Sequence, residues 1–459
     1  MKLYNSLSKE KEEFKPIQLG EVSMYSCGPT VYDKVHIGNL RSFILSDFIR
    51  RSFEYLDYNV LQVMNITDIG HLVSDADDGE DKMSKGLRRE GKEINIENML
   101  ALADGYAHLF MQDIAALNML TPQHLPKASD HIQEDIDIIK QLEEKGFVYV
   151  ISDGVYFDVS KMPDYGKLGG INLDGNAHSR IGENSEKRNP ADFALWKLDT
   201  NLGWDSPWGQ GFPGWHIECS GMSKKYLGDH FDIHTGGIDN RDIHHNNEIA
   251  QSECSSGKPF VNYWIHGEHL DLNNEKLSKS TGGNITLETL SEKGFSPFDF
   301  RYLSLQTHYR SKMNFTWEVL ESARSGLEKV YKQIIGLRKQ PNGTGAIDQE
   351  WKVKFIEKVS DDINLPQALA VFHDMMKSDL NPADKLLTAL DFDCILGLNL
   401  SDQKESSIEI PKNVQTLLTE RLQARLIKDW TESDRLRDEV AVLGYKVLDI
   451  SGEQFIEKI

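Results

Sequence analysis

Residues 22–65 constrain the fold of this chain more than any other stretch. Val22 to Tyr25 form an apolar run, residues 59–66 form a second one, and apolar residues recur at helical spacing between them. A polar loop that contains Gly38 leads from the first run into the helical pattern. The pattern predicts a β–loop–α–β unit whose loop opens onto the amino terminus of a helix. Free backbone N–H groups at such a terminus favour phosphate.

The remaining sequence continues this pattern and then departs from it. Strand-like runs resume at residues 230–234 and 260–272, and helices are predicted at 95–117 and at 130–146, where Asp130 is the expected N-cap. Residues 147–159 predict a hairpin, and 160–214 look irregular. After about residue 300 the pattern changes, and helices without strands between them are predicted at 315–338, 351–363 and 366–376.

We therefore predict an α/β fold, a Rossmann-like doubly wound parallel sheet with an inserted module, followed by an all-α helical bundle and a small C-terminal domain. The expected boundaries are 1–310 for the sheet domain with an insertion at about 120–214, 311–400 for the bundle, and 412–459 for the last domain.

Composition narrows the class of protein. The chain has 459 residues and a net charge of −21, so it has no global basic field, and any nucleic-acid contact would need a local basic stripe. Four cysteines in so long a chain argue against a disulfide framework and for a reducing compartment. No apolar signal core or membrane-length apolar run is found. We expect a cytoplasmic protein without a membrane partner.

Several distant residues have the chemistry of metal ligands. Cys219 follows the irregular region, and His244 and Glu248 share one face of a predicted helix because they are four residues apart. Together with Cys27, at the end of the first strand, they form a donor set that suits tetrahedral zinc. His216 and His245 are weaker candidates, and Cys254 and Cys394 are interpreted as ordinary small core residues.

Two further motifs suit polyphosphate chemistry. Residues 36–39 read HIGN and surround a glycine that lets a ligand approach the backbone. Residues 276–280 read KLSKS, and two lysines there can stabilise charge on a leaving pyrophosphate. Each motif alone is weak, but the two in this order in an α/β chain are specific.

These two motifs resemble the HIGH and KMSKS motifs of class I aminoacyl-tRNA synthetases. With CGPTVYD, NITD, PGWHIECS, FDIHTGG, HHNNEIAQSE and NYWIHGEHL, the chain is similar to the cysteinyl-tRNA synthetase family from about residue 20 to its end. The resemblance implies ATP-dependent attachment of L-cysteine to tRNA(Cys) through a cysteinyl-adenylate, with Zn²⁺ selecting the cysteine thiolate and Mg²⁺ accompanying ATP. The implied partners are tRNA(Cys), L-cysteine and ATP, with no obligatory protein partner.

The resemblance also implies roles for individual residues. The zinc ligands are Cys27, Cys219, His244 and Glu248. ATP is bound by His36, Gly38, Asn39, Lys276 and Lys279, of which all but Gly38 are also catalytic. The amino acid is bound by Cys27, Thr67, Trp215 and His234.

Two sequence features need comment. Asn39 replaces the last histidine of the first motif, and its amide can donate to a phosphate but cannot carry a proton. Residues 82–86, KMSKG, are closer in letters to KMSKS than KLSKS is, but they lie in an acidic stretch, 68–96, that we interpret as a solvated surface excursion. They are not expected to form the catalytic loop.

The C-terminal tail bears on the choice among functions. It has five basic residues, Arg421, Arg425, Lys428, Arg435 and Arg437, and Trp430 is a candidate for stacking on an unpaired base. A solvated helix face with mixed charges remains an alternative for this set. A cysteine–amino-sugar ligase of the same superfamily should lack such a tail, and a non-catalytic zinc-stabilised RNA-binding protein would not need HIGN and KLSKS. The tail and the motifs together favour the synthetase.

Overall fold

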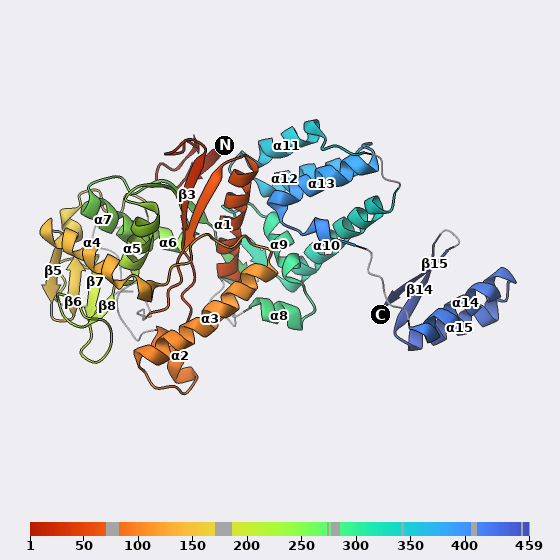
Figure 1. Ribbon diagram of the computed structural model, residues 1–459, viewed down its shortest axis with the longest axis horizontal. Helices are drawn as coiled ribbons and strands as arrows, with labels where there is room; N and C mark the ends of the chain where they lie inside the picture. Colours follow the sequence, from red (N-terminus) through yellow and green to blue (C-terminus); the bar gives the residue numbers. More distant parts are fainter. Residues whose placement is uncertain are drawn as a thin grey trace. The chain divides into compact units, whose positions relative to one another are not determined.

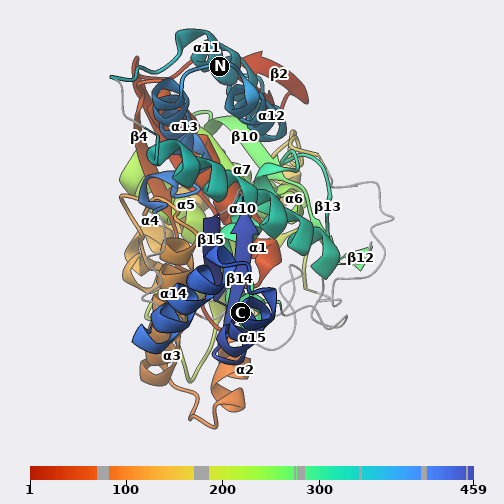
Figure 2. The same ribbon diagram turned by 90° about the vertical axis from the view of Figure 1, so that its right-hand side faces the viewer.

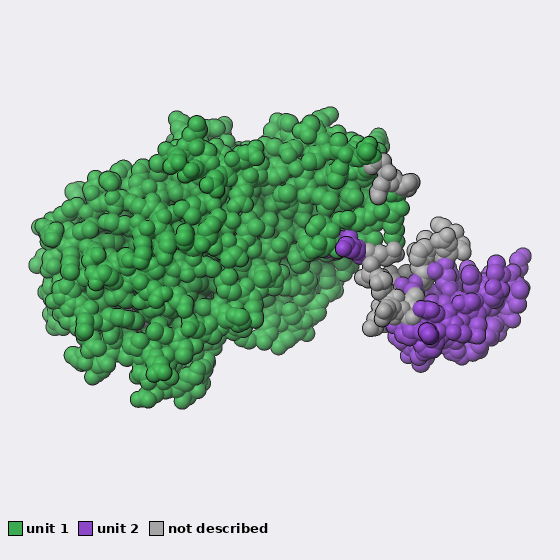
Figure 3. Space-filling model, in the orientation of Figure 1, with its two compact units in different colours: residues 1–402 green, residues 403–459 purple. Residues whose placement is uncertain are grey.

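The computed structural model describes residues 1–69, 82–169, 186–272, 275–276, 285–340, 344–404, 411–450 and 453–458. The chain forms two compact units, Met1–Asp402 and Gln403–Ile459, which are coloured separately in Figure 3. Each unit is described by itself.

The first unit is built on a parallel sheet of four strands. Their order is β10 (Val261–Gly267), β9 (Phe231–Gly237), β3 (Glu21–Ser26) and β4 (Asn59–Met64). These four strands coincide with the predicted apolar runs. All four carboxyl ends therefore meet at one edge of the sheet, where ligands of such folds bind.

Helices cover both faces of this sheet (Figure 1). Helix α1 (Ile37–Tyr55) packs on one face, and α5 (Trp215–Leu227) and α7 (His244–Ser256) pack on the other. Successive residues of β3 point to opposite sides, so that Met24 belongs to the core around α1 and Tyr25 to the core around α5 and α7. The predicted doubly covered parallel sheet is confirmed.

The inserted module contains a second sheet. Its four antiparallel strands are β5 (Val148–Ile151), β6 (Gly154–Phe157), β7 (Phe193–Leu198) and β8 (Gly211–Pro213). The hairpin at 147–159 is confirmed, but the prediction that 160–214 is irregular is wrong for β7 and β8. Two short strands separated by Gly, Pro and Trp give too weak a period to detect.

Three helices precede the strands of this module in the chain. Helix α4 (Ile132–Glu144) begins after His131, whereas the expected N-cap Asp130 lies in a 3-10 turn, Ala128–Asp130. Before it come α2 (Lys82–Arg89) and α3 (Ile96–Ala116). The interpretation of 68–96 as a solvated excursion is wrong for α2, because Met83 and Leu87 are completely buried.

The helical region that follows packs as a group of neighbouring helices (Figures 1 and 2). They are α9 (Pro297–Leu305), α10 (Trp317–Arg338), α11 (Gln349–Val359), α12 (Leu365–Lys377) and α13 (Pro382–Leu396). The other elements of this unit are short: β1 (Lys2–Asn5), β2 (Glu10–Glu13), α6 (Ile238–Asp242), β11 (Leu270–Leu272), β12 (Glu275–Lys276), α8 (Leu287–Glu292) and β13 (Met313–Phe315).

A buried charge network joins α1 to the helical region. Asp47 of α1 accepts from Arg51 Nε at 2.9 Å and from Arg301 Nη2 of α9 at 2.7 Å. Arg301 is completely buried and also donates to the carbonyls of Leu117 and Leu396. The single carboxylate therefore neutralises two guanidinium groups whose other donors bind backbone.

The second unit has a small core of its own. It consists of α14 (Lys412–Leu426), α15 (Trp430–Val442) and the antiparallel pair β14 (Tyr445–Ile450) and β15 (Glu453–Lys458). Its buried apolar residues are Val414, Val440, Tyr445 and Val447.

Candidate active site and metal centre

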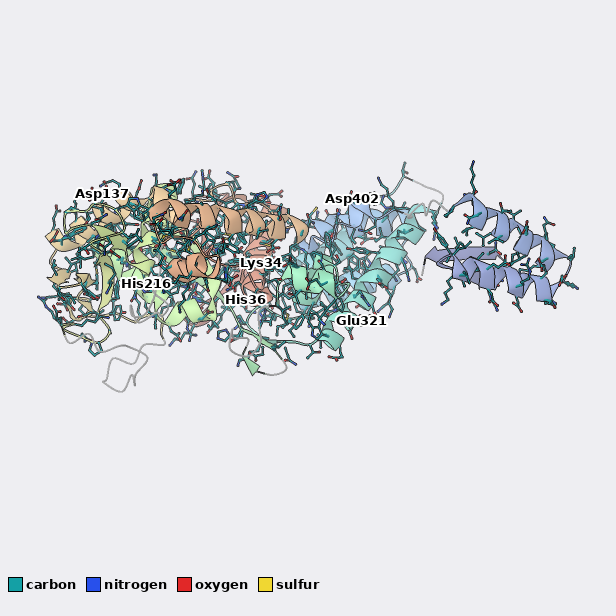
Figure 4. All side chains as sticks on the ribbon, turned by 90° about the horizontal axis from the view of Figure 1, so that it is seen from below. Lys34, His36, Asp137, His216, Glu321 and Asp402 are labelled. Carbon is teal, nitrogen blue, oxygen red and sulfur yellow. The ribbon has the colours of Figure 1, made fainter. Side chains whose placement is uncertain are left out.

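The amino terminus of α1 forms one end of the site. His36 is its N-cap, and its Nδ1 accepts from the backbone N–H of Asn39 at 3.3 Å. No acidic residue lies in the first turn, which contains Gly38, so no negative charge there competes with a phosphate. Lys34 and His36, which are labelled in Figure 4, belong to the loop that leads into α1, and both line the pocket described below. The predicted helix terminus at residues 36–39 is therefore present, and its phosphate-binding role stays a prediction.

Four metal-type donors converge at the other end. They come from three segments: Cys27 directly follows β3, Cys219 lies in α5, and His244 and Glu248 lie one turn apart in α7. One ligand atom from each lies within 4.8 Å of every other. Three of the four are buried, and Cys27 is half-buried. The structure brings together the four residues predicted as zinc ligands.

A second donor set overlaps the first. It combines Cys27 and Glu248 with His234 and His245, again with ligand atoms within 4.8 Å. His245 Nε2 lies 3.2 Å from Cys27 Sγ, and His234 Nε2 lies 2.9 Å from Glu248 Oε2. The predicted pocket residue His234 is thus completely buried against a carboxylate. The first set has two thiols and the second has one, and soft thiolate ligands select zinc, which favours the first set.

The electrostatics of the first set fit a divalent cation. Burial alone would raise the pKa of Glu248, but His234 and His244 lower it to about 2. Burial alone would lower the pKa of His244, but Glu248 and Cys219 raise it to about 10. The hydrogen bond with Cys27, together with burial, raises the pKa of the Cys219 thiol well above its ordinary value. Cys219 and His244 therefore carry protons in the absence of a metal. A metal that binds them would displace these protons, because zinc ligands must be deprotonated.

Neighbouring groups orient these donors. His216 Nδ1 lies 2.8 Å from His244 Nδ1, which leaves His244 Nε2 directed toward Glu248 Oε1 at 3.0 Å. That carboxylate oxygen receives no well-aligned hydrogen bond from the described residues. A metal-ligating histidine is expected to have its second ring nitrogen held by a neighbour. A bound cation would account for a buried carboxylate oxygen that has no well-aligned hydrogen bond.

A pocket of about 270 Å³ connects the two ends. Its lining includes Cys27, Cys219 and His244 at the metal-type end and His36 and Asn39 at the helix terminus. The predicted amino-acid residues Thr67 and Trp215 also line it, whereas His234 does not. The structure therefore places the metal-type donors and the amino terminus of α1 in one cavity.

The polar residues of this pocket that sequence reasoning missed include Asn65, Asp239 and Asn240. Asn65 accepts from the Gly28 N–H at 2.7 Å and donates to Thr67 Oγ1 at 3.0 Å. A Cβ on Gly28 would lie 1.8 Å from the Asn65 carbonyl oxygen, so only glycine fits there. Asn65 directly follows β4, and Asp239 and Asn240 lie in α6, which begins directly after β9. Their positions at the carboxyl ends of buried parallel strands were the signal that could have identified them.

The second lysine motif is only partly visible. The backbone of Lys276 pairs with Asp271 in the β11–β12 ladder. Lys279 lies outside the described residues.

Within the described part of the chain, every helix is too short or too polar to span a lipid bilayer.

Comparison with known proteins agrees with this geometry. The family model described as the tRNA synthetases class I (C) catalytic domain matches residues 13–325. Among solved structures, a Mycobacterium tuberculosis methionyl-tRNA synthetase in complex with methionyl-adenylate shares the fold, with a TM-score of 0.54 at 12% identity over 82% of this chain and 90% of that chain. The parallel sheet and the site at its carboxyl edge are those of a class I aminoacyl-tRNA synthetase.

Named relatives show to which family of class I synthetases the chain belongs. The chain is 46% identical to cysteine–tRNA ligase 1 of Burkholderia lata over 97% of this chain and 94% of that protein. It is 41% identical to the cysteine–tRNA ligase of Treponema denticola over the full length of both. The Cysteinyl-tRNA ligase anticodon binding domain matches residues 408–456. The chain belongs to the cysteine–tRNA ligase family.

Proposed function

We propose that this chain selects L-cysteine through a Zn²⁺ ion held by Cys27, Cys219, His244 and Glu248. The reaction is that of its family, the ATP-dependent attachment of L-cysteine to tRNA(Cys). The observation that carries the zinc proposal is the convergence of these four donors, from three separate segments, within 4.8 Å at one end of the pocket.

Selection is the chemical problem that this metal centre would solve. Cysteine and serine differ in one atom, and shape alone discriminates such pairs poorly. Zinc supplies a preference for a soft thiolate over a hydroxyl and favours the deprotonated thiol. Thr67 and Trp215 line the pocket beside the donors and would contact the rest of the amino acid. A separate editing site would then be unnecessary.

Activation would use the opposite end of the pocket. We place the phosphates of ATP, with Mg²⁺, at the amino terminus of α1, where His36, Gly38 and Asn39 supply donors. A carboxylate oxygen of cysteine attacks the α-phosphorus, and pyrophosphate leaves as the cysteinyl-adenylate forms. Lys276 and Lys279 are assigned to the charge that develops on pyrophosphate. A ribose hydroxyl of the tRNA then attacks the acyl carbon of the cysteinyl-adenylate, which forms the ester and releases AMP.

The tRNA would be read by the rest of the chain. We assign residues 1–310 to catalysis with the insertion at about 120–214, 311–400 to the body of the tRNA, and 412–459 to the anticodon, the last supported by the matching domain at 408–456. The free thiols of all four cysteines suit a reducing cytoplasm, which we propose as the location.

The basic set of the tail needs reassessment. Arg421 is buried and, with Arg425, pairs with Asp449; Arg435 pairs with Glu432 and Glu439, and Arg437 pairs with Asp434. Four of the five cations are thus neutralised locally. Trp430 is 56% exposed, with the Arg425 guanidinium 5.8 Å from its ring centroid. An aromatic platform is better supported than a free positive field.

One set of assays tests the proposal. Purified enzyme is analysed for zinc, and pyrophosphate exchange is measured with cysteine or serine before and after removal of the metal. We expect about one zinc per chain and exchange that requires cysteine and is lost with the metal. The acceptor is then varied between tRNA(Cys) and an amino sugar. Metal-independent exchange would contradict the zinc role, and charging of the sugar alone would favour the other ligase.

A further prediction concerns Trp430. Base–aromatic stacking contributes about 1–3 kcal/mol, so Trp430→Ala should lower kcat/KM for tRNA(Cys) about 5- to 150-fold. Exchange without tRNA should not change, because it needs no anticodon. Val442→Ala, at another exposed apolar position of the same unit, is the control and should have little effect. An equal fall in exchange and aminoacylation would place the defect elsewhere.

A further inference from the structure

Helix α2 contains the KMSKG sequence and lies against the outer side of the active-site pocket. Tyr32 and Asp33 line that pocket, in the loop that leads to His36. Met83 and Leu87 are buried, which anchors α2 on the protein. The helix is therefore part of the structure that surrounds the site, although its motif does not belong to the catalytic loop.

Gly86 lets α2 approach the pocket wall closely. A Cβ at this position would lie 3.2 Å from the Tyr32 carbonyl oxygen and 2.8 Å from Cδ2 of Leu102 in α3. The absence of a Cβ at Gly86 therefore lets α2 lie closer to the Tyr32 carbonyl than another residue would without a small shift. The backbone of α2 thus packs closely against the backbone of Tyr32.

Arg89, at the end of α2, holds the same wall by hydrogen bonds. Its Nη1 donates to Asp33 Oδ2 at 2.9 Å, and its Nη2 donates to the Tyr32 carbonyl at 3.0 Å and to Tyr106 Oη at 2.8 Å. The planar guanidinium fixes carboxylate and carbonyl relative to each other, which a lysine cannot do. Arg89 does not itself line the pocket.

The loop segment that Arg89 contacts, Tyr32 and Asp33, leads to the end of the pocket where we place the phosphates of ATP. Lys34 follows Asp33 and forms an ion pair with Glu288 of α8, so the loop is held from α2 on one side and from α8 on the other. His36 comes two residues later and caps α1 (Figure 4). The position of this loop therefore decides where the α1 terminus presents its donors. Of the cysteine end, Cys219 and His244 lie on other segments, and Cys27 lies at the start of this loop, directly after β3 and away from Tyr32 and Asp33 in the sequence.

We propose that Arg89 is a positioning residue for ATP, acting through Tyr32 and Asp33. The inference rests on the proposed function, because it assumes that ATP occupies the His36 end of the pocket. Without the paired hydrogen bonds from Arg89, Tyr32 and Asp33 are free to shift. Small misplacements of bound reactants lower the reaction rate strongly. The effect should fall on ATP and leave cysteine binding alone.

The test uses cysteine-dependent pyrophosphate exchange by the full-length enzyme. Arg89→Gln should raise KM for ATP about tenfold and leave KM for cysteine and the midpoint of thermal unfolding unchanged. Arg89→Lys keeps the charge without the fork and should give most of the same increase. Tyr106→Phe removes the phenol that Arg89 also contacts and should give a smaller increase in the same constant. Lys85→Met removes an exposed cation of the same helix and is the matched control, with no change expected.

The outcomes separate the two hypotheses. If the wild-type enzyme shows no exchange with ATP and cysteine, the proposed function fails. If it does, and Arg89→Gln leaves KM for ATP unchanged, the positioning role is wrong. Equal increases in both KM values, or a lowered unfolding midpoint with a uniform loss of activity, would also overturn it, because they indicate a general structural role.

Discussion

Replacing Cys219 by serine should remove the metal and cysteine activation together. Cys219 is buried and lies in the set of four donors, and a hydroxyl is a much weaker zinc ligand than a thiolate. We expect bound zinc to fall from about one per chain to a small fraction, and exchange to fall more than about a hundredfold. Metal analysis and exchange at saturating ATP measure the two effects.

Cys254→Ser is the matched control for this substitution. Cys254 lies in α7, the helix that carries His244 and Glu248, but outside both donor sets. Its replacement should leave zinc content and exchange unchanged. Retention of full zinc and full exchange by Cys219→Ser would contradict the assignment. Circular dichroism of each variant separates loss of the ligand from loss of the fold.

The largest loss of stability is expected from Asp47→Ala. The substitution leaves Arg51 and Arg301 buried without their carboxylate and removes the acceptor of the Leu120 N–H. Removing one partner of a buried ion pair costs about 3–5 kcal/mol, mostly because a buried charge is left unpaired. Urea denaturation followed by circular dichroism should show this fall in the free energy of unfolding.

The control for Asp47→Ala is an exposed ion pair. Glu350 and Lys354 pair along α11 with exposed side chains, and such pairs contribute about 0–1 kcal/mol. Glu350→Ala should therefore change the free energy of unfolding by no more than this amount. A similar small effect for Asp47→Ala would show that the network of α1 and α9 does not join the two regions as described.

Much of the fold could be predicted because the buried strands of a parallel sheet are continuous apolar runs. Such runs identified β3, β4, β9 and β10. The same reasoning failed for α2, because Met83 and Leu87 are its buried anchors within a charged stretch. It also failed for β7 and β8, because β7 pairs with β6 across a long stretch of intervening chain and β8 has only three residues.

The site was predictable to the extent that its residues belong to long motifs. Cys27, Cys219, His244 and Glu248 were identified before their convergence was known, and the structure brings them together. The ion-pair partners of charged residues were not predictable, because nothing in the sequence indicates that Arg421 is buried against Asp449. Likewise, the overlap of His234 and His245 with the metal set depends on the packing of β9 against α7.

The division of the chain into two units has a consequence for how the tRNA is held. Residues 403–459 form a compact unit with a core of their own, yet they remain covalently joined to the catalytic unit. Once either unit has bound the tRNA, the other meets its part of the same molecule at an effective concentration on the order of millimolar. Each contact can then be weak by itself. The charged tRNA can be released rapidly because the loss of one contact is enough to weaken the whole complex.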